Sequence, residues 1–354
     1  MQDAQAIYRI PPYTLGPEVY MAQQIEDIVD WGLLAHGIPD HWKETEGEGI
    51  VVGVADTGKP EHPDLKDTIL ESRNFSSSYT DVDQIGHGSH VCGIIAAARN
   101  DTGVIGVAPK AKLITAKVLG DDGSGDNAAV TQGIRWLTEQ GCHIINLSLG
   151  GPFDAGITQA VKDAVDAGIF VICAAGNYGK IDGKNTISYP ARLPYTVAVG
   201  SYNKAGRLSR FSSRGPQIHV AFPGENILST WLDGKYRRIS GTSMASPFAS
   251  AVTALLLAKQ NKPSSADAGE PVRLENNRDL IRLFQSSAED KGPTGRDPGW
   301  GWGVVDVEKA MKLAAIPPEE ESEPAQDIDL LFGMVRLRYP VELDGKTGAF
   351  IYIQ

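Results

Sequence analysis

Three residue types that can act together in nucleophilic catalysis follow one another along the chain, each close to a glycine. They are Asp56, His87 and Ser243. A carboxylate can orient an imidazole, the imidazole can take a proton from a hydroxyl, and the hydroxyl oxygen can then attack a carbonyl carbon. The set therefore predicts a serine nucleophile at Ser243 with His87 as its base.

The segments around these residues differ in how specific they are. Asp56-Thr57-Gly58 taken alone is most often a strand end and a turn, whereas a histidine between two glycines at a helix start is more suggestive. The strongest segment is Gly-Thr-Ser-Met-Ala-Ser-Pro at residues 241–247, which begins an apolar stretch reaching about residue 259. Its glycine lets the backbone approach closely, and a helix N-terminus offers free N–H groups to a negatively charged oxygen.

Alternating strand-like and helix-like segments must position these residues. Helical periodicity is found at residues 127–139 and 157–167. Continuous apolar runs, typical of strands buried on both faces, occupy residues 50–55, 112–119, 143–149, 169–175 and 196–199. This alternation predicts an α/β fold with a mostly parallel central sheet and helices on both faces. Asp56 and Asn177 follow two of these strands, at the sheet edge where ligands collect.

Together these segments resemble those of the subtilase, or subtilisin-like serine protease, family over about residues 31–313. The resemblance implies a subtilisin-like fold and a serine endopeptidase that cleaves peptide bonds through an acyl-enzyme. It also implies roles: Asp56 orients His87, His87 is the general base, and Ser243 attacks the scissile carbonyl. Asn177 and the Ser243 N–H would hold the oxyanion, while the second histidine, His90, falls at a structural position.

The same resemblance implies a cleft in which an extended substrate is clamped between two strands, so that chain conformation is selected more than side chain. No acidic residue is evident at the floor of its specificity pocket, which favours broad cleavage after large apolar residues. The residues of this cleft would be Gly123, Ser124, Gly125, Ser148, Leu149, Gly150 and Ser188.

A structural Ca²⁺ ion is also implied by the resemblance. Carboxylate and carbonyl oxygens form a ligand set that suits calcium. The ligands would be Asp27, Asp64, Ala98, Asn100, Thr102 and Val104. The alternative is a surface turn without metal. A second cation site is not expected, because His219 stands where a carboxylate would be needed.

Residues 1–24 form an N-terminal extension too short for a foldable prodomain. Within it, Tyr8-Arg9-Ile10-Pro11-Pro12-Tyr13 resembles the Leu-Ile-Pro-Tyr segment of intracellular subtilisins, the relatives closest in character. In those relatives the segment lies across the active site and inhibits the enzyme. Prolines have a fixed φ and no N–H, so they resist placing a scissile bond at the nucleophile. The resemblance thus implies a latent form inhibited by the protein's own N-terminal segment, the alternative being a disordered tail.

The remaining chain divides into three parts. Residues 25–315 form the predicted catalytic domain, in which residues 262–276 read as a polar surface insertion. An acidic linker at residues 316–327 leads to two short β-like runs at residues 328–354, which suggest a hairpin appendage too small to be stable alone.

Composition limits the partners and the location. The net charge of −11 argues against nucleic acid or an anionic membrane as a partner, leaving protein or peptide substrates and a possible homo-oligomer. We find no secretory signal and no apolar stretch long enough to span a bilayer, which favours a cytoplasmic protein. Its three cysteines are too few for a disulfide framework and read as small buried apolar residues.

Three other functions are disfavoured. An aspartic protease would use two Asp-Thr-Gly triplets, but those at residues 56–58 and 101–103 are too close together for two lobes. An inactive subtilase serving as a binding module is disfavoured because every residue that the chemistry needs is present. A dinucleotide-binding enzyme would need a Gly-x-Gly-x-x-Gly turn after the first strand, and none follows residues 50–55.

Overall fold

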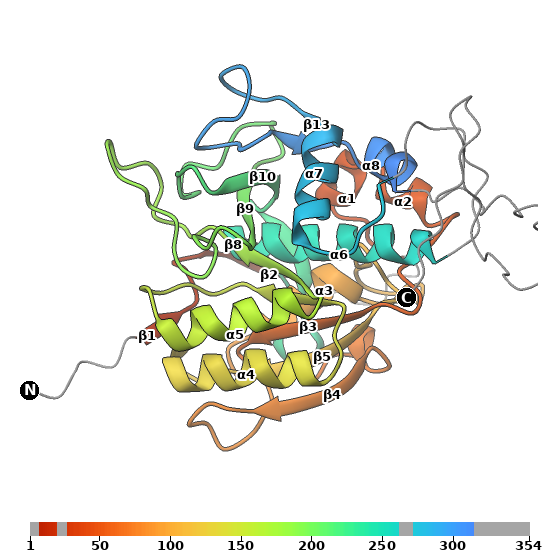
Figure 1. The fold of residues 1–354 in the computed structure, drawn as a ribbon. Helices are drawn as coiled ribbons and strands as arrows, with labels where there is room; N and C mark the ends of the chain where they lie inside the picture. Colours follow the sequence, from red (N-terminus) through yellow and green to blue (C-terminus); the bar gives the residue numbers. More distant parts are fainter. Residues whose placement is uncertain (1–6, 20–26, 262–271, 315–354) are drawn as a thin grey trace, which may run out of the picture.

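A computed structural model describes residues 7–19, 27–261 and 272–314. Its centre is a nine-stranded sheet (Figure 1). In spatial order the strands are β13 (Ala288–Glu289), β14 (Val304–Val305), β10 (Ile218–Pro223), β9 (Val197–Tyr202), β8 (Phe170–Ala174), β7 (Ile144–Leu147), β3 (Val51–Asp56), β5 (Lys112–Lys117) and β4 (Ile69–Asn74). All neighbouring strands pair in parallel, except that β13 pairs antiparallel with β14.

Helices cover both faces of this sheet. On one face lie α4 (Asn127–Glu139) and α5 (Ala155–Asp166), side by side in Figure 1. The other face carries α3 (His87–Ala96), α6 (Thr242–Gln260), α7 (Asn277–Ser287) and α8 (Val307–Leu313). Each face therefore has its own apolar core, and the strands between them are buried on both sides.

Two small sheets lie outside the central one. The three-stranded sheet has the order β11 (Ile227–Thr230), β12 (Tyr236–Ser240) and β2 (Thr14–Val19). The two-stranded sheet joins β1 (Ile7–Arg9) to β6 (Ser124–Asp126). Both sheets thus include a strand from the N-terminal extension. The remaining short elements are α1 (Trp31–Ala35), α2 (Ile38–His41) and the 3₁₀ turns η1 (Pro63–Leu65) and η2 (Leu232–Gly234).

The predicted fold class is confirmed: the chain has a mostly parallel central sheet with helices on both faces. Each predicted strand is present within a few residues of its expected bounds, and α4 has the expected bounds. The predicted acidic linker at 316–327, the hairpin at 328–354 and most of the insertion at 262–276 lie outside the described residues. Among the residues that are described, no helix is both long and apolar enough to cross a membrane.

Candidate active site

The first pair of predicted site residues meets at the carboxyl end of β3. Asp56 is the last residue of that strand and His87 the first of α3, and Asp56 Oδ1 lies 2.7 Å from His87 Nδ1. The same oxygen accepts the Thr57 N–H at 2.7 Å. Both side chains are almost wholly buried. His87 Nε2 is also buried, and within the described part of the chain it has no hydrogen-bond partner.

Asp83, which the sequence did not single out, ties the end of β3 to the start of α3. Its Oδ1 accepts the Thr57 hydroxyl at 2.8 Å and the Gly86 N–H at 2.9 Å, and its Oδ2 accepts the Ser89 N–H and hydroxyl. Buried Lys117 donates to the Thr57 carbonyl from the opposite side. Since these bonds hold both backbones that carry the Asp56–His87 pair, Asp83 positions that pair.

Ser243 is the second residue of α6 and is wholly buried. Its hydroxyl donates to the Ser148 carbonyl at 3.2 Å rather than to His87. The Ser148 hydroxyl bonds the Ser243 carbonyl at 3.0 Å and Ser246 Oγ at 2.9 Å, which fixes the first turn of the helix against the end of β7. The Ser243 backbone N–H lies among the free N–H groups of a long helix, where a negative charge is stabilised.

Asn177 faces Ser243 from the loop after β8, and its amide is held at both ends. Its Oδ1 accepts the Thr242 N–H at 2.9 Å and the Thr242 hydroxyl at 2.8 Å. Its Nδ2 donates to the Pro12 carbonyl at 2.8 Å. Because Thr242 fixes the oxygen end, the nitrogen end must point into the cleft, where it holds a backbone carbonyl.

The N-terminal segment occupies the cleft as an extended chain between two strands. On one side β1 pairs antiparallel with β6, and Ile10 N–H donates to the Gly123 carbonyl at 3.3 Å. On the other side Arg9 and Gly150 exchange two backbone hydrogen bonds, of 3.0 and 2.9 Å. Four of the predicted cleft residues, namely Gly123, Ser124, Gly125 and Gly150, thus lie along residues 7–10.

Side chains of the segment fill the cleft. Tyr8 has no exposed surface, and its hydroxyl donates to the Pro152 carbonyl at 2.7 Å. Its ring lies against Gly151, where a Cβ atom would be 2.8 Å from the ring, and in one apolar cluster with Leu149. The Tyr13 ring lies 5.5 Å from the His87 ring, centre to centre. The segment therefore covers the catalytic histidine position as well as the strands beside it.

The predicted pocket residue Ser188 lies beside two glycines. A Cβ atom on Gly150 would come within 2.8 Å of the Ser188 Cβ, and one on Gly176 within 2.7 Å of its hydroxyl oxygen. Ser188 is 8% exposed. Both glycines therefore pack directly against Ser188, where a larger residue would clash with it.

The predicted calcium loop lies between two carboxylates. Asp64 Oδ2 accepts the Val104 N–H at 3.2 Å and the Tyr236 hydroxyl at 2.9 Å, and its Oδ1 lies 3.5 Å from Asn100 Nδ2. Asp27 lies beside this loop because the next residue, Ile28, forms a β-bridge with Val104. Burial raises the pKa of the Asp27 carboxyl, which the N–H groups of the loop partly offset.

Asp27 Oδ1 is buried and has no partner among the described residues. An unpaired buried carboxylate oxygen suits a cation, and the donor set has the oxygen chemistry that calcium prefers. The described residues contain no cluster of three acidic, histidine or cysteine side chains. A cation here would therefore depend on the carbonyl oxygens of the loop, which are those of Ala98, Thr102 and Val104.

Buried histidines and cysteines near the site are structural. His90 Nε2 lies 3.0 Å from the Ile227 carbonyl and 2.9 Å from the Arg237 carbonyl, and burial lowers the pKa of His90 to about 3. The three cysteines are buried and free, and burial raises the pKa of the Cys92 thiol well above its usual value. The interpretation of the cysteines as small buried apolar residues is confirmed.

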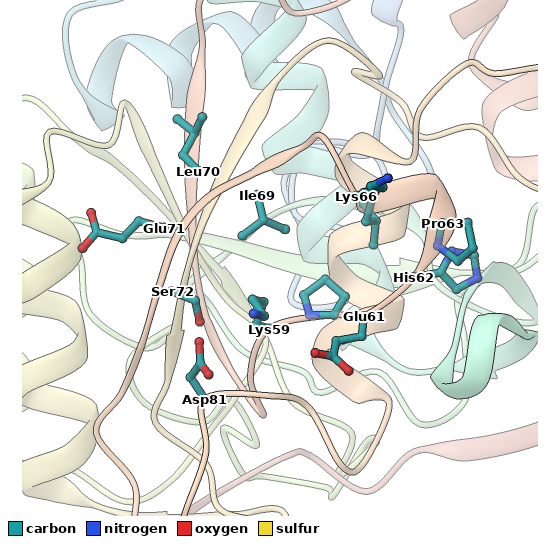
Figure 2. A pocket seen from close by; sticks show the side chains of 12 residues that line it. Lys59, Glu61, His62, Pro63, Lys66, Ile69, Leu70, Glu71, Ser72 and Asp81 are labelled. Carbon is teal, nitrogen blue, oxygen red and sulfur yellow. The ribbon is translucent and has the colours of Figure 1, made fainter.

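A surface cavity of about 710 Å³ lies away from this site (Figure 2). Residues of η1 and β4 line it, among them Pro63 and Ile69, together with Lys59, His62 and Asp81 from the adjoining loops. None of the predicted catalytic residues is part of its lining. The cleft at Ser243 is instead filled by the protein's own residues 7–13.

Several known proteins are similar in sequence to much of this chain. A model of the subtilase family matches residues 47–303. An intracellular serine protease of Paenibacillus polymyxa is 40% identical over 270 residues, which cover 74% of this chain and 82% of that protein. The major intracellular serine protease of Bacillus subtilis (strain 168) is 44% identical over 258 residues, covering 70% and 80%. Subtilisin DY of Bacillus licheniformis is 42% identical over 217 residues, covering 60% and 78%.

Proposed function

The chain belongs to the subtilase family and is a serine endopeptidase, and on this basis we propose that Asp56, His87 and Ser243 are its catalytic triad. The 2.7 Å contact between Asp56 Oδ1 and His87 Nδ1 carries the assignment. A carboxylate bonded to Nδ1 leaves the Nε2 lone pair to accept the Ser243 proton. The Ser243 oxygen then attacks the substrate carbonyl, His87 protonates the leaving amine, and water hydrolyses the acyl-enzyme.

Asn177 and the Ser243 N–H form the proposed oxyanion hole. The support is that Asn177 Nδ2 already donates to a backbone carbonyl, that of Pro12, at 2.8 Å. A donor held in this position stabilises the charge that develops on a carbonyl oxygen in the tetrahedral state, without having to reorient.

Substrates are proposed to bind as residues 7–10 do, in an extended form that pairs with β6 on one side and with Gly150 on the other. The residue expected at the floor of the specificity pocket is the uncharged Ser188, against which Gly150 and Gly176 pack. An uncharged floor supports a broad endopeptidase that prefers a large apolar residue before the scissile bond.

We further propose that the full chain is latent because residues 7–13 occupy this cleft. If the Arg9–Gly150 ladder continued by two residues, residue 11 would lie opposite Ser148. Pro11 has no N–H to donate there, and the Ser148 carbonyl accepts the Ser243 hydroxyl instead. The hydroxyl is thereby held away from His87, so the segment fills the cleft while Ser243 is not set to attack it.

A latent form suits a protease that acts on proteins or peptides inside a cell. The support for that location is the naming of two relatives, from Paenibacillus polymyxa and Bacillus subtilis, as intracellular proteases. We propose the cytoplasm as the place of action and removal of the N-terminal segment as the activating step.

A Ca²⁺ ion is proposed at the loop of residues 98–104, held by Asp27, Asp64, Asn100 and carbonyls of the loop. The buried, unpaired Asp27 Oδ1 supports the site. The ion would neutralise two neighbouring carboxylates and join the segment after residue 26 to the loop that follows α3, so its part in the protein is structural.

Active-site labelling tests the triad. A serine-directed phosphonofluoridate should label the wild-type protein once its N-terminal segment is removed, and Ser243→Ala should give neither label nor peptide cleavage. Ser250→Ala, on the same helix, is the matched control and should keep both. Peptide cleavage by Ser243→Ala at the wild-type rate would overturn the assignment.

A further inference from the structure

The N-terminal extension continues past the catalytic residues as β2, which pairs antiparallel with β12. The partners are Thr14 with Ser240, Leu15 with Ile239, Glu18 with Arg237 and Val19 with Tyr236. If Asn177 marks the position of the scissile carbonyl, as in the proposed function on which this inference rests, Pro12 occupies that position and β2 follows the path of a leaving group.

A leaving group would pass along β12 because this strand leads directly into α6, the helix that carries Ser243. Only Gly241 separates the end of β12 from the start of α6, which carries Ser243. In the small sheet, β11 covers one edge of β12 and β2 covers the other. Without β2, the second edge would present backbone N–H and C=O groups to any extended chain that leaves the active site.

Two cationic side chains at this edge favour the binding of a carboxylate. Arg237 Nη1 lies 3.3 Å from Glu18 Oε1, and Lys235 Nζ lies 3.6 Å from Glu18 Oε2. Both carboxylate oxygens of one acidic residue are thus bound from β12 and the residue before it. Lys235 Nζ also lies 3.6 Å from Asp233 Oδ2, so the two cations share this edge with one further carboxylate.

Trp231 holds Arg237 independently of β2. The guanidinium lies over the ring of buried Trp231, 5.1 Å from the ring centre. Its Nε donates to the Gly16 carbonyl of β2 at 3.1 Å, a place that a backbone carbonyl of a substrate could take. A guanidinium fixed on an aromatic face loses little freedom when it binds a carboxylate. The neighbouring Arg238 instead bonds Asp30 and the Asn226 carbonyl.

We propose that the edge of β12, with Lys235 and Arg237, is a recognition site for the leaving-group side of polypeptide substrates and selects an acidic side chain there. Glu18 is the sixth residue after Pro12 and shows where that side chain binds. The register of β2 is interrupted between Arg237 and Ile239. A substrate that pairs without the interruption presents its fifth residue to the same cations.

The test uses the full chain and peptides that extend seven residues beyond the cleaved bond. A single Glu is moved through leaving-group positions three to seven, and kcat/KM is compared with that of the Gln peptide. Both are measured on the same preparation, so the fraction of molecules with an open cleft cancels from the ratio. Glu at position five or six should raise kcat/KM about 3- to 10-fold, as expected for a charge-assisted contact at a partly exposed site.

Variants assign the preference to the two cations. Arg237→Gln combined with Lys235→Gln should remove the Glu preference, and Arg238→Gln, which removes the same charge from the same strand, should keep it. The preference should also shrink with added salt. Once the N-terminal segment has been removed, peptides that end two residues after the cleaved bond should be cleaved equally by all these variants.

Equal kcat/KM for Glu and Gln peptides, or a Glu preference that survives the double substitution, would overturn the recognition site while leaving the proposed catalysis intact. In that case β12 would bind only β2 of the protein's own N-terminal extension. Failure of any peptide to be cleaved after the N-terminal segment has been removed, or cleavage by Ser243→Ala, would instead overturn the proposed function.

Discussion

Asn177 shows how one side chain is aimed by its neighbour. Thr242 donates two hydrogen bonds to its oxygen, from the N–H and the hydroxyl, so that the amide cannot rotate without losing both. The nitrogen is therefore held toward the carbonyl of whichever chain lies in the cleft. A donor that needs no reorganisation contributes more to the transition state than to the bound ground state.

Asn177→Ala should therefore lower kcat by about 100- to 1000-fold with little change in KM. Steady-state kinetics on a chromogenic peptide at saturating concentration measures this. The loop residue Asn203→Ala is the control and should keep the wild-type kcat. If Asn177→Ala instead raises KM and leaves kcat unchanged, its amide serves in binding rather than in the transition state.

The residues of the site could be predicted from the sequence where a glycine or proline stands next to them or one residue away. His87 lies between two glycines and Ser243 follows Gly241, because helix starts at these positions need close backbone approach: a Cβ on Gly86 would lie 2.6 Å from the Trp231 ring. Asp83 could not be found in this way. Its hydrogen bonds join Thr57 to Ser89, and only the folded chain brings those residues together.

At the scale of elements, the N-terminal extension is two strands joined by two prolines. Its first strand pairs with β6 and its second with β12, while Pro11 and Pro12 lie between them at the catalytic residues. Tyr8 anchors the first half, since its ring is wholly buried under the cleft wall. The block over the cleft therefore depends on a few side chains as well as on backbone pairing.

Tyr8→Ala should raise kcat/KM of the full chain about 10- to 100-fold, up to the level of a chain lacking residues 1–19, because losing a buried aromatic ring weakens the closed state. Tyr8→Phe is the matched control: it keeps the packing, loses only the bond to the Pro152 carbonyl, and should stay largely latent. Cleavage of a short peptide is the measurement, with the N-terminus checked by mass spectrometry afterwards. Equal activity of the full and shortened chains would rule out latency.

Apolar runs predicted the parallel strands because both faces of each strand are buried, as in β3 and β8. The pairing of β2 with β12 could not be predicted in this way. In β12 the buried residues Tyr236 and Ile239 are separated by two arginines, so no strand-like alternation is visible. That strand is held by Trp231, five residues before it, and by Asp30 and the extension, which come from distant parts of the sequence.

At the scale of the whole molecule, the proposed calcium ion should stabilise the native state by mass action. Prolonged dialysis against a chelator should lower the melting temperature by roughly 5 to 10 °C, as expected when a ligand near 100 times its Kd is removed from a domain of this size. Asp27→Asn should reduce this response, and Asp101→Asn, in the same loop, should not. A melting temperature indifferent to the chelator would count against the ion.

Acid should destabilise the fold through three buried histidines. Burial lowers the pKa of His36 and of His219 to about 4, and that of His90 to about 3, from a usual value of 6.5. As the pH falls below 6.5 the unfolded chain takes up protons that the folded chain cannot, so stability is lost. Between pH 7.5 and 5.5 the loss should be about 4 kcal/mol, or about 1.4 kcal/mol for each histidine.

Urea unfolding at pH 7.5, 6.5 and 5.5 measures this loss, with Ser243→Ala used to prevent self-digestion. His90→Gln should remove about a third of the pH dependence. A free energy of unfolding that stays constant over this range would show that the three imidazoles are accessible to protons in the folded protein.

Because the segment that is proposed to block the cleft is part of the same chain, its local concentration at the cleft does not depend on the amount of protein. For short flexible tethers this effective concentration is about millimolar, so even a weakly binding sequence keeps the cleft closed. Diluting the protein should not switch it on, and the same sequence added as a free peptide should be a poor inhibitor. One cut between the segment and the domain would make the block bimolecular, so that release becomes irreversible at cellular concentrations.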